Sequence, residues 1–230
     1  MRIGIVVGMV AEAERALAPA ASLPEPLRPL IFIAGGCAGR AYRGACELLR
    51  AGASALLSFG VAGGLDPALE TGDAVLASEV VLPDGAHLES DPRWQRSLAV
   101  ALAGRARVGG IAGRDMMIAT RAGKETLASR TGAVAVDMES HEVARAAAEA
   151  GVPFMALRVI LDPLGGQLPW AALVGLAPDG SRRALPVLAR LLLRPWELPR
   201  LIALARDNRR ALTALGRLAA DLGPAFGFLV

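Results

Sequence analysis

The sequence predicts an α/β protein: a single three-layer α/β/α domain around a central mixed sheet, with additional C-terminal helices. Apolar runs rich in β-branched residues alternate with segments of helical period, as in domains built from alternating strands and helices. Several runs are apolar throughout, as expected for strands covered by helices on both faces. The 230 residues, 53% of them hydrophobic, suffice for one large domain with a substantial core.

The expected strands and helices alternate along the first 160 residues. We expect strands over residues 2–7, 30–34, 55–61, 74–82, 107–112, 133–138 and 153–160. We expect helices over residues 11–18, 40–51, 93–103, 121–129 and 139–150. The last helix should stop at Gly151, because Pro153 lies just beyond it.

The character of the sequence changes after Asp162. Residues 185–194 and 198–222 are rich in leucine, alanine and arginine, and the second segment has a helical period. From residue 181 onward there are nine arginines against three acidic residues, so the basic excess gathers here. We therefore expect a core over residues 1–166 and a helical extension over 168–230. The extension either packs as ordinary helices, forms a dimer contact or touches a lipid surface.

Composition disfavours several classes of protein. Cys37 and Cys46 form no Cys-x-x-Cys pair and there are only two histidines, so no metal site is expected. The N-terminal apolar run is too short to span a membrane and lacks a cleavage site, which favours a cytoplasmic protein. The basic segments lack interleaved aromatic residues, which disfavours nucleic-acid binding.

Three segments bring together residue types that can carry chemistry. In residues 59–73, a strand runs into Gly60 and then Gly63-Gly64, followed by a turn at Asp66-Pro67. Glycines after a strand let backbone N–H groups approach an anion or a sugar closely, although a tight turn without a ligand has the same pattern.

The other two segments place carboxylates at strand ends. A buried strand delivers Asp137, Met138 and Glu139 to the start of a helix. A carboxylate there can accept two ribose hydroxyls, or it can simply favour the helix dipole. An apolar strand ends at Asp162, before a proline and two glycines. This aspartate is either an ordinary turn residue or a partly buried acid whose raised pKa lets it donate a proton near neutral pH.

Together these segments resemble the purine nucleoside phosphorylase and methylthioadenosine/adenosylhomocysteine nucleosidase superfamily, from residue 1 to about residue 166. The motifs that carry the resemblance are IGIVVGMVAE, FGVAGGLDPALETGD, AGRDMMI, VDMES and GVPFMALRVILD, in matching order and spacing. The resemblance implies a nucleoside phosphorylase-like fold and an enzyme that cleaves the N-glycosidic bond of a purine nucleoside. It implies no metal or organic cofactor.

The resemblance also implies roles for individual residues. Asp162 would protonate the purine ring nitrogen N7 as the bond breaks, and Glu12 would be the second catalytic residue. The ribose would lie against Asp137, Met138 and Glu139. The base would lie against a strand over 112–118 that carries Asp115, Met117 and Ile118.

The nucleophile is left open between water and phosphate. Glu12 matches the glutamate that orients water in nucleosidases, and a carboxylate there would repel phosphate. Arg40, with Gly63 and Val61 of the glycine segment, could instead form a phosphate site, and phosphate would then be a co-substrate. Val61 stands where a hydroxyl residue often contacts the nucleophile, and Leu161 replaces a serine-like residue, so the pocket is unusual for a nucleosidase.

A more specific resemblance, over almost the entire chain, is to the hopanoid-associated phosphorylase branch. SFGVAGGLDPAL, DMMIATRAGKETLA, AVDMESHEVARAAAEAGVPF and the Pro/Leu/Arg-rich tail carry it. It implies release of adenine from adenosylhopane in hopanoid biosynthesis, with the tail peripheral to the inner membrane and the chain in a homo-oligomer. Two alternatives stay open: a nucleosidase for methylthioadenosine or adenosylhomocysteine, and a non-catalytic nucleoside- or lipid-binding subunit of a membrane assembly.

Overall fold

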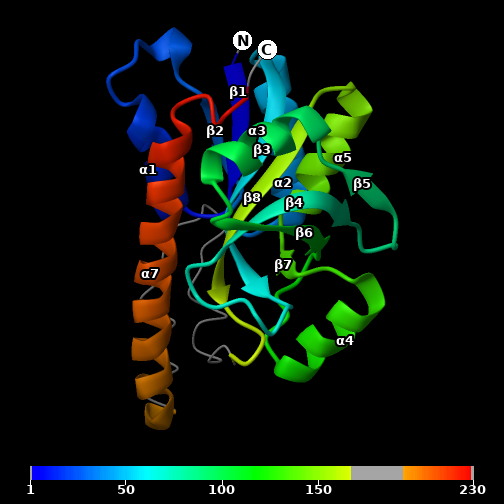
Figure 1. The fold of residues 1–230 in the computed structure, drawn as a ribbon, viewed down its shortest axis with the longest axis vertical. Coiled ribbons are helices and arrows are strands. Elements are labelled where there is room, and N and C mark those ends of the chain that lie inside the picture. The colour runs from blue at the N-terminus through cyan, green and yellow to red at the C-terminus, as the bar shows by residue number, and fades with distance from the viewer. Residues whose placement is uncertain (1, 167–193, 229–230) are drawn as a thin grey trace.

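The computed structural model describes residues 2–166 and 194–228, and it confirms the three-layer α/β/α fold with a mixed sheet (Figure 1). The expected helix over residues 185–194 lies outside the described residues, apart from Arg194.

The sheet has eight strands, one more than expected. They are β1 (Arg2–Val7), β2 (Leu30–Ile33), β3 (Ala53–Gly64), β4 (Ala74–Val81), β5 (His87–Glu89), β6 (Ala106–Gly113), β7 (Ala135–Asp137) and β8 (Phe154–Asp162). Their order is β2-β1-β3-β7-β6-β4-β5, and β8 pairs with both β3 and β4. The pairs β3–β7, β4–β5 and β4–β8 are antiparallel and the others are parallel. Strands β3, β8, β4, β6 and β7 therefore pair in a closed circle.

Several helix ends coincide with capping residues in the sequence. The helices are α1 (Val10–Leu17), α2 (Ala38–Arg50), α3 (Pro92–Leu102), α4 (Arg121–Thr131), α5 (Ser140–Ala150) and α7 (Leu198–Leu222), with short 3-10 turns η1 (Ala18–Ala20), η2 (Glu25–Leu27) and η4 (Pro195–Glu197). Asp91 and Thr120 cap the starts of α3 and α4 through their side-chain oxygens. Gly132 and Gly151 end α4 and α5 in the left-handed conformation that glycine favours.

Two hydrophobic cores lie on opposite faces of the sheet. Neighbouring residues of one strand enter different cores, because side chains of a strand alternate between faces. Ile5 and Leu57 pack with Trp94 of α3 and Leu215 of α7. On the other face, side chains of β1, β3 and β8 pack against α2 and α5.

Helix α7 has the bounds that its leucine period predicts. Its C-terminal half packs as an ordinary core helix, with Ala211, Leu212, Leu215, Leu218, Ala219 and Leu222 buried. Its N-terminal turns reach past the sheet along one side of the domain (Figure 1). No described helix is long and apolar enough to cross a membrane.

Two expected boundaries are wrong. The strand expected to end at residue 61 continues to Gly64 by pairing with both β7 and β8, and the expected turn at Asp66-Pro67 follows it. The expected strand over 112–118 is also wrong beyond Gly113. There β6 ends level with the last residue of its partner β7, so residues 114–118 have no strand to pair with.

Candidate active site

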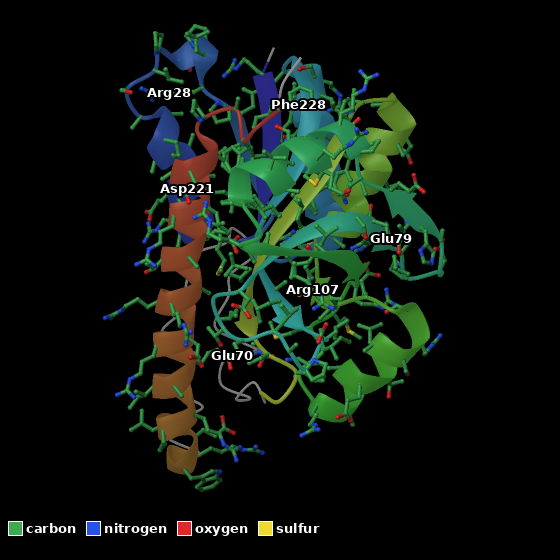
Figure 2. The ribbon with its side chains drawn as sticks, viewed as in Figure 1. Arg28, Glu70, Glu79, Arg107, Asp221 and Phe228 are labelled. Atoms are coloured by element: carbon green, nitrogen blue, oxygen red, sulfur yellow. The ribbon has the colours of Figure 1, made fainter. Side chains whose placement is uncertain are left out.

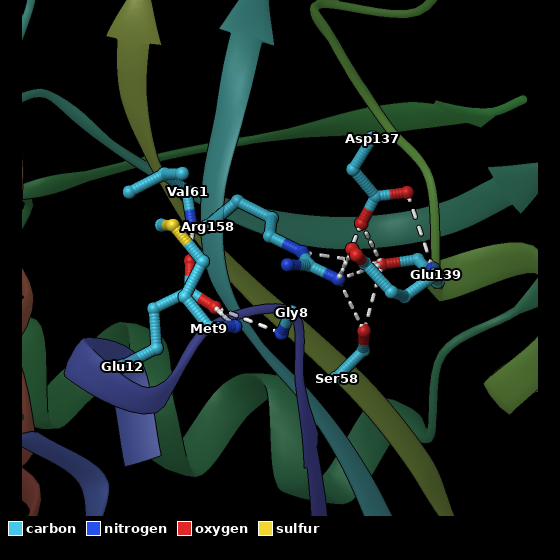
Figure 3. A network of polar contacts seen from close by, with 9 residues as sticks. Gly8, Met9, Glu12, Ser58, Val61, Asp137, Glu139 and Arg158 are labelled. Atoms are coloured by element: carbon cyan, nitrogen blue, oxygen red, sulfur yellow. Dashed lines mark hydrogen bonds and ion pairs between the residues drawn. The ribbon is translucent and has the colours of Figure 1, made fainter. Parts of the chain in front are cut away.

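Glu12 lies where the end of β1, the start of α1 and β3 meet (Figure 3). Its carboxylate accepts three backbone N–H groups, Oε2 from Gly8 and Met9 and Oε1 from Val61, each at 2.8 Å. A carboxylate has about four acceptor positions, so roughly one remains, on Oε1. The residue is only 2% exposed. Glu12 is thus held in one orientation with one oxygen able to accept another hydrogen bond.

Arg158 of β8 is the centre of a buried polar network (Figure 3). Its Nη2 lies 2.5 Å from Oδ2 of Asp137 and 3.3 Å from Oε2 of Glu139. The guanidinium also donates to the hydroxyls of Ser58 and Ser140. A buried charge is tolerated only with such partners, so the network fixes the orientation of both carboxylates.

Two glycines allow these charged groups to lie close to the backbone. A Cβ at Gly60 would lie 2.7 Å from both Nη1 of Arg158 and Oε1 of Glu12. A Cβ at Gly8 would lie 2.7 Å from Oε1 of Glu139. Within residues 2–166 and 194–228, Nη1 makes no hydrogen bond. Nη1 of Arg158 and Oε1 of Glu12 thus both lie close above Gly60, and each has hydrogen-bonding capacity left.

The cluster carries more negative than positive charge. Three carboxylates, of Glu12, Asp137 and Glu139, face one guanidinium, which leaves two negative charges when all four groups are ionised. Burial raises the pKa of Glu12, against the opposing effects of Arg158 and three backbone N–H groups. Burial also raises the pKa of Glu139 to about 8, against Arg158, and the neighbouring carboxylates add to the rise. Glu139 can therefore hold a proton near neutral pH.

Asp162 ends β8 and faces α4. It is 8% exposed, and its Oδ2 lies 2.6 Å from Nζ of Lys124. Burial raises the pKa of this carboxyl, while Lys124 opposes the rise. The expected environment, a partly buried strand-end acid with a raised pKa, is present, and the lysine partner is an addition that the sequence did not lead us to expect.

Asp162 and Arg158 lie on the same strand, at its last and at its middle residue. They are four residues apart on β8, roughly 13 Å along an extended strand. The pairing register of β8 with β3 shifts between Ala62 and Gly63, and such irregularities re-aim side chains next to sites. The strand thus carries a carboxyl with a raised pKa at its last residue and a buried network of charged groups at its middle residue.

The residues expected to contact the base lie in the loop after β6. Met117 is 45% exposed, and Ile118 is half-buried next to Gly123 at the start of α4. Asp115 is exposed and its Oδ1 lies 3.0 Å from Nε2 of His141. Ile118 is thus the one of the three that lies beside the helix carrying Lys124.

The residues expected around the ribose and the nucleophile divide into two groups. Met138 is half-buried between the two carboxylates of the network, and Val61 donates its N–H to Glu12. Gly63 pairs with Val136 in the sheet. Arg40 does not join the cluster: its Nε and Nη2 donate to the carbonyls of Ala34 and Ile33, each at 3.0 Å, at the end of β2.

Sequence reasoning missed four residues of the site, Ser58, Lys124, Ser140 and Arg158. Arg158 is a single charge within the apolar run FMALRVILD, and a charge in a buried strand must have a counter-charge. Lys124 is the only lysine among 25 basic residues. Both signals were visible in the sequence. No sequence pattern marked Ser58 or Ser140 as part of the site.

Comparison with known proteins agrees with the fold. Residues 2–194 match the family model described as the Phosphorylase superfamily. No curated protein sequence matches the chain. Among the residues that the structure describes, no group of three or more His, Cys, Asp or Glu side chains is placed to hold a metal ion.

Several solved structures share the architecture at low sequence identity. The futalosine hydrolase of Helicobacter pylori is 19% identical with a TM-score of 0.67, and the match covers 96% of this chain and 97% of that one. The S-adenosylhomocysteine nucleosidase of Streptococcus pyogenes, in complex with 5-methylthiotubericidin, is 20% identical with a TM-score of 0.65, covering 95% and 97%. The 5′-methylthioadenosine/S-adenosylhomocysteine nucleosidase of Campylobacter jejuni is 19% identical with a TM-score of 0.66, covering 95% and 100%.

Proposed function

The chain belongs to the phosphorylase superfamily, and we propose that it hydrolyses the N-glycosidic bond between a purine base and ribose. One observation carries the proposal: β8 ends at a carboxyl with a raised pKa, Asp162, and its middle residue, Arg158, is the centre of a carboxylate-rich network. These are the two requirements of the reaction, an acid for the leaving base and negative charge beside the sugar.

The base leaves as a neutral purine when it receives a proton at N7. Asp162 is the acid, because burial raises the pKa of its carboxyl towards the range in which it can donate. Positive charge then develops on the ribose as the bond to the base lengthens. Glu12, and Glu139 in its ionised form, stabilise that charge, since both lie in a buried setting where charges interact strongly.

The nucleophile is water in this proposal. A water bound by Arg158 and Glu12 would accept from Nη1 of the arginine and donate to Oε1 of the glutamate, which takes its proton as it attacks. Phosphate, a dianion at neutral pH, would enter against a net charge of up to two negative units. Arg40, the cation that sequence analysis offered for a phosphate site, directs two of its donors to backbone carbonyls.

The favoured substrate is a small adenosine thioether, such as methylthioadenosine or adenosylhomocysteine. The similar solved structures include nucleosidases for these compounds, and they match nearly the full length of this chain. On the ribose, Glu139 would accept hydroxyl hydrogen bonds, with Met138 packing on the sugar.

A second candidate is adenosylhopane, in keeping with the hopanoid-associated resemblance. It is favoured by the exposed apolar side chains at the start of α7, where Trp196 is 70%, Leu198 48% and Ile202 46% exposed. Arginines accompany them, and side chains along the outer side of α7 extend into solvent (Figure 2). An exposed basic and aromatic surface of this kind is suited to an anionic lipid surface.

Release of adenine distinguishes these substrates. We would incubate the protein with methylthioadenosine, adenosylhomocysteine and adenosylhopane, each with and without phosphate. The proposal expects adenine from a thioether without phosphate. Adenine from the lipid alone would select the second candidate, and a requirement for phosphate would refute hydrolysis. Asp162→Asn should abolish release, whereas Asp84→Asn, on an exposed turn, should not. Full activity of Asp162→Asn would refute the acid role.

Membrane contact has its own test. If the start of α7 meets the inner membrane from the cytoplasmic side, the protein should sediment with anionic vesicles at low salt and be released at high salt. Trp196→Ser should weaken this binding. Absence of sedimentation at low salt would refute peripheral association. The expected homo-oligomer is checked by light scattering of the same preparation.

A further inference from the structure

Lys124 is a fully buried cation, and its contacts include more than the ion pair with the carboxylate of Asp162. Its side chain is 0% exposed, and Nζ donates to three oxygens: Oδ2 of Asp162 at 2.6 Å, the carbonyl of Asp162 at 2.8 Å and the carbonyl of Pro163 at 2.9 Å. An ammonium group has three donors, and all three are used. The lysine therefore holds the proposed acid, Asp162, by hydrogen bonds to its side chain, to its backbone and to the next residue.

The choice of lysine at this position is informative. Every other basic side chain among the 25 lysines and arginines of the chain is arginine. Arginine forms the stronger, two-pronged ion pair with a carboxylate, but it does not lose its proton in proteins. Lysine is the cation that can become neutral when buried. A purely structural ion pair gives this chain no reason to depart from arginine here.

We propose that Lys124 is a positioning residue that acts through Asp162, storing the proton that the carboxyl group passes to the leaving base. This rests on the proposed function, because it assigns the source of the proton for that reaction. Burial pushes both partners towards their neutral forms: it lowers the pKa of Lys124 and raises the pKa of Asp162, while their attraction opposes each effect. The two forms of the pair are therefore brought closer in free energy than in water.

The first proton transfer takes place between Lys124 and Asp162. The Nζ–H bond breaks and the proton passes to Oδ2 of Asp162, leaving the electron pair on a neutral amine. The carboxyl group gives the proton to the purine, and the electrons of the C–N bond stay with the departing base. Asp162 is again a carboxylate, and Lys124 regains a proton from water after the base has left.

One other charged group influences the pair. Asp207 of α7 raises the pKa of Asp162. The pKa of Lys124 is set by burial, which lowers it, and by Asp162, which opposes that effect. No further ionised partner of Lys124 or Asp162 is present in the described ranges. A titration of Lys124 therefore reports chiefly on Asp162.

The single lysine makes that titration direct. Protein labelled with 13C-lysine and carrying no lysine-containing tag gives one Cε resonance, which shifts when Nζ loses its proton. We expect a midpoint below the ordinary value of about 10.4, and a lower midpoint still in Asp162→Asn, which removes the opposing charge. A midpoint at or above the ordinary value, or one that Asp162→Asn leaves unchanged, would overturn the proposal.

Two variants test the same idea through activity. Lys124→Arg keeps a permanent cation that holds Asp162 as a carboxylate, so base release should fall at least about 100-fold at every pH. Lys124→Met removes the cation, so Asp162 keeps its own proton to higher pH and release at pH 6 should exceed that of Lys124→Arg. A structural ion pair predicts the reverse order, and Lys124→Arg equal to or above Lys124→Met would overturn the proposal.

Failure of the proposed function can be told apart from failure of the proposed role of Lys124. If the unaltered protein releases no base from any nucleoside, the proposed function fails, and the Cε titration still decides whether the pair shares a proton. If Lys124→Arg does not fold, as judged by circular dichroism, the same titration decides.

Discussion

Replacing Glu139 by glutamine should stabilise the folded protein at alkaline pH while it impairs catalysis. Burial raises the pKa of Glu139 from its ordinary 4.5 to about 8. The folded state therefore binds this proton more tightly than the unfolded state. The resulting penalty is absent below pH 4.5, grows as pH rises and is complete above pH 8. At about 1.4 kcal/mol per pH unit, the full penalty is roughly 5 kcal/mol.

Glutamine keeps the size of the side chain and cannot ionise, so it removes that penalty. It also takes one anionic partner from Arg158, whose Nη2 lies 3.3 Å from Oε2. The attraction of Arg158 for the ionised carboxyl is already part of the raised pKa of Glu139, so it is not subtracted a second time. The expectation is a gain of up to roughly 5 kcal/mol at pH 9 that disappears towards pH 5.

Urea unfolding at pH 5, 7 and 9 measures the effect, with adenine release measured on the same samples. Glu14→Gln is the matched control. The Glu14 side chain is 63% exposed, so this substitution should leave the free energy of unfolding unchanged at all three pH values. A stability difference for Glu139→Gln that is flat with pH, or that becomes more unfavourable as pH rises, would refute the argument from burial.

Three further predictions follow from the same network and core. Gly60→Ala places a Cβ 2.7 Å from two buried polar atoms, so it should lower the free energy of unfolding in urea by about 1–3 kcal/mol and abolish base release. Gly39→Ala, which has open space around its Cβ, should change neither. Arg158→Met leaves buried carboxylates without their cation and should cost about 3–5 kcal/mol at pH 8 but less at pH 5, where they can protonate; equal losses at both pH values would contradict this. Leu215→Ala should cost about 2–5 kcal/mol in thermal unfolding because the residue is fully buried, while Ile202→Ala, on the exposed turns of the same helix, should cost under about 0.5 kcal/mol.

The fold was predictable from sequence wherever burial leaves a pattern. Strands covered on both faces are apolar runs, and helix α7 shows its packed side as a leucine period. Strand β5 has only three residues, and its exposed His87 and Glu89 give no apolar pattern; it forms because β4 offers a partner. The extension of β3 through Gly64 was equally hidden, because the strands that pair with these glycines come from much later in the chain.

The site was predictable as far as its carboxylates. Glu12, Glu139 and Asp162 follow or end strands, where ligand sites of open sheets gather, and the structure places each of them buried. Their two cationic partners were not predicted. Arg158 lies within an apolar strand and Lys124 lies on a helix far from both carboxylates in the sequence, so only their packed positions reveal which carboxylates they face.

The closed circle of β3, β8, β4, β6 and β7 has a consequence for how the molecule opens. A ring of paired strands has no free edge from which it can be unzipped, so the amides of β8 should exchange with deuterium only when the whole ring breaks. The outermost strands β2 and β5 can fray alone and should exchange first. Of the two, β5 is too short and too charged to template growth by another chain, which leaves β2 as the edge where intermolecular strand addition would begin.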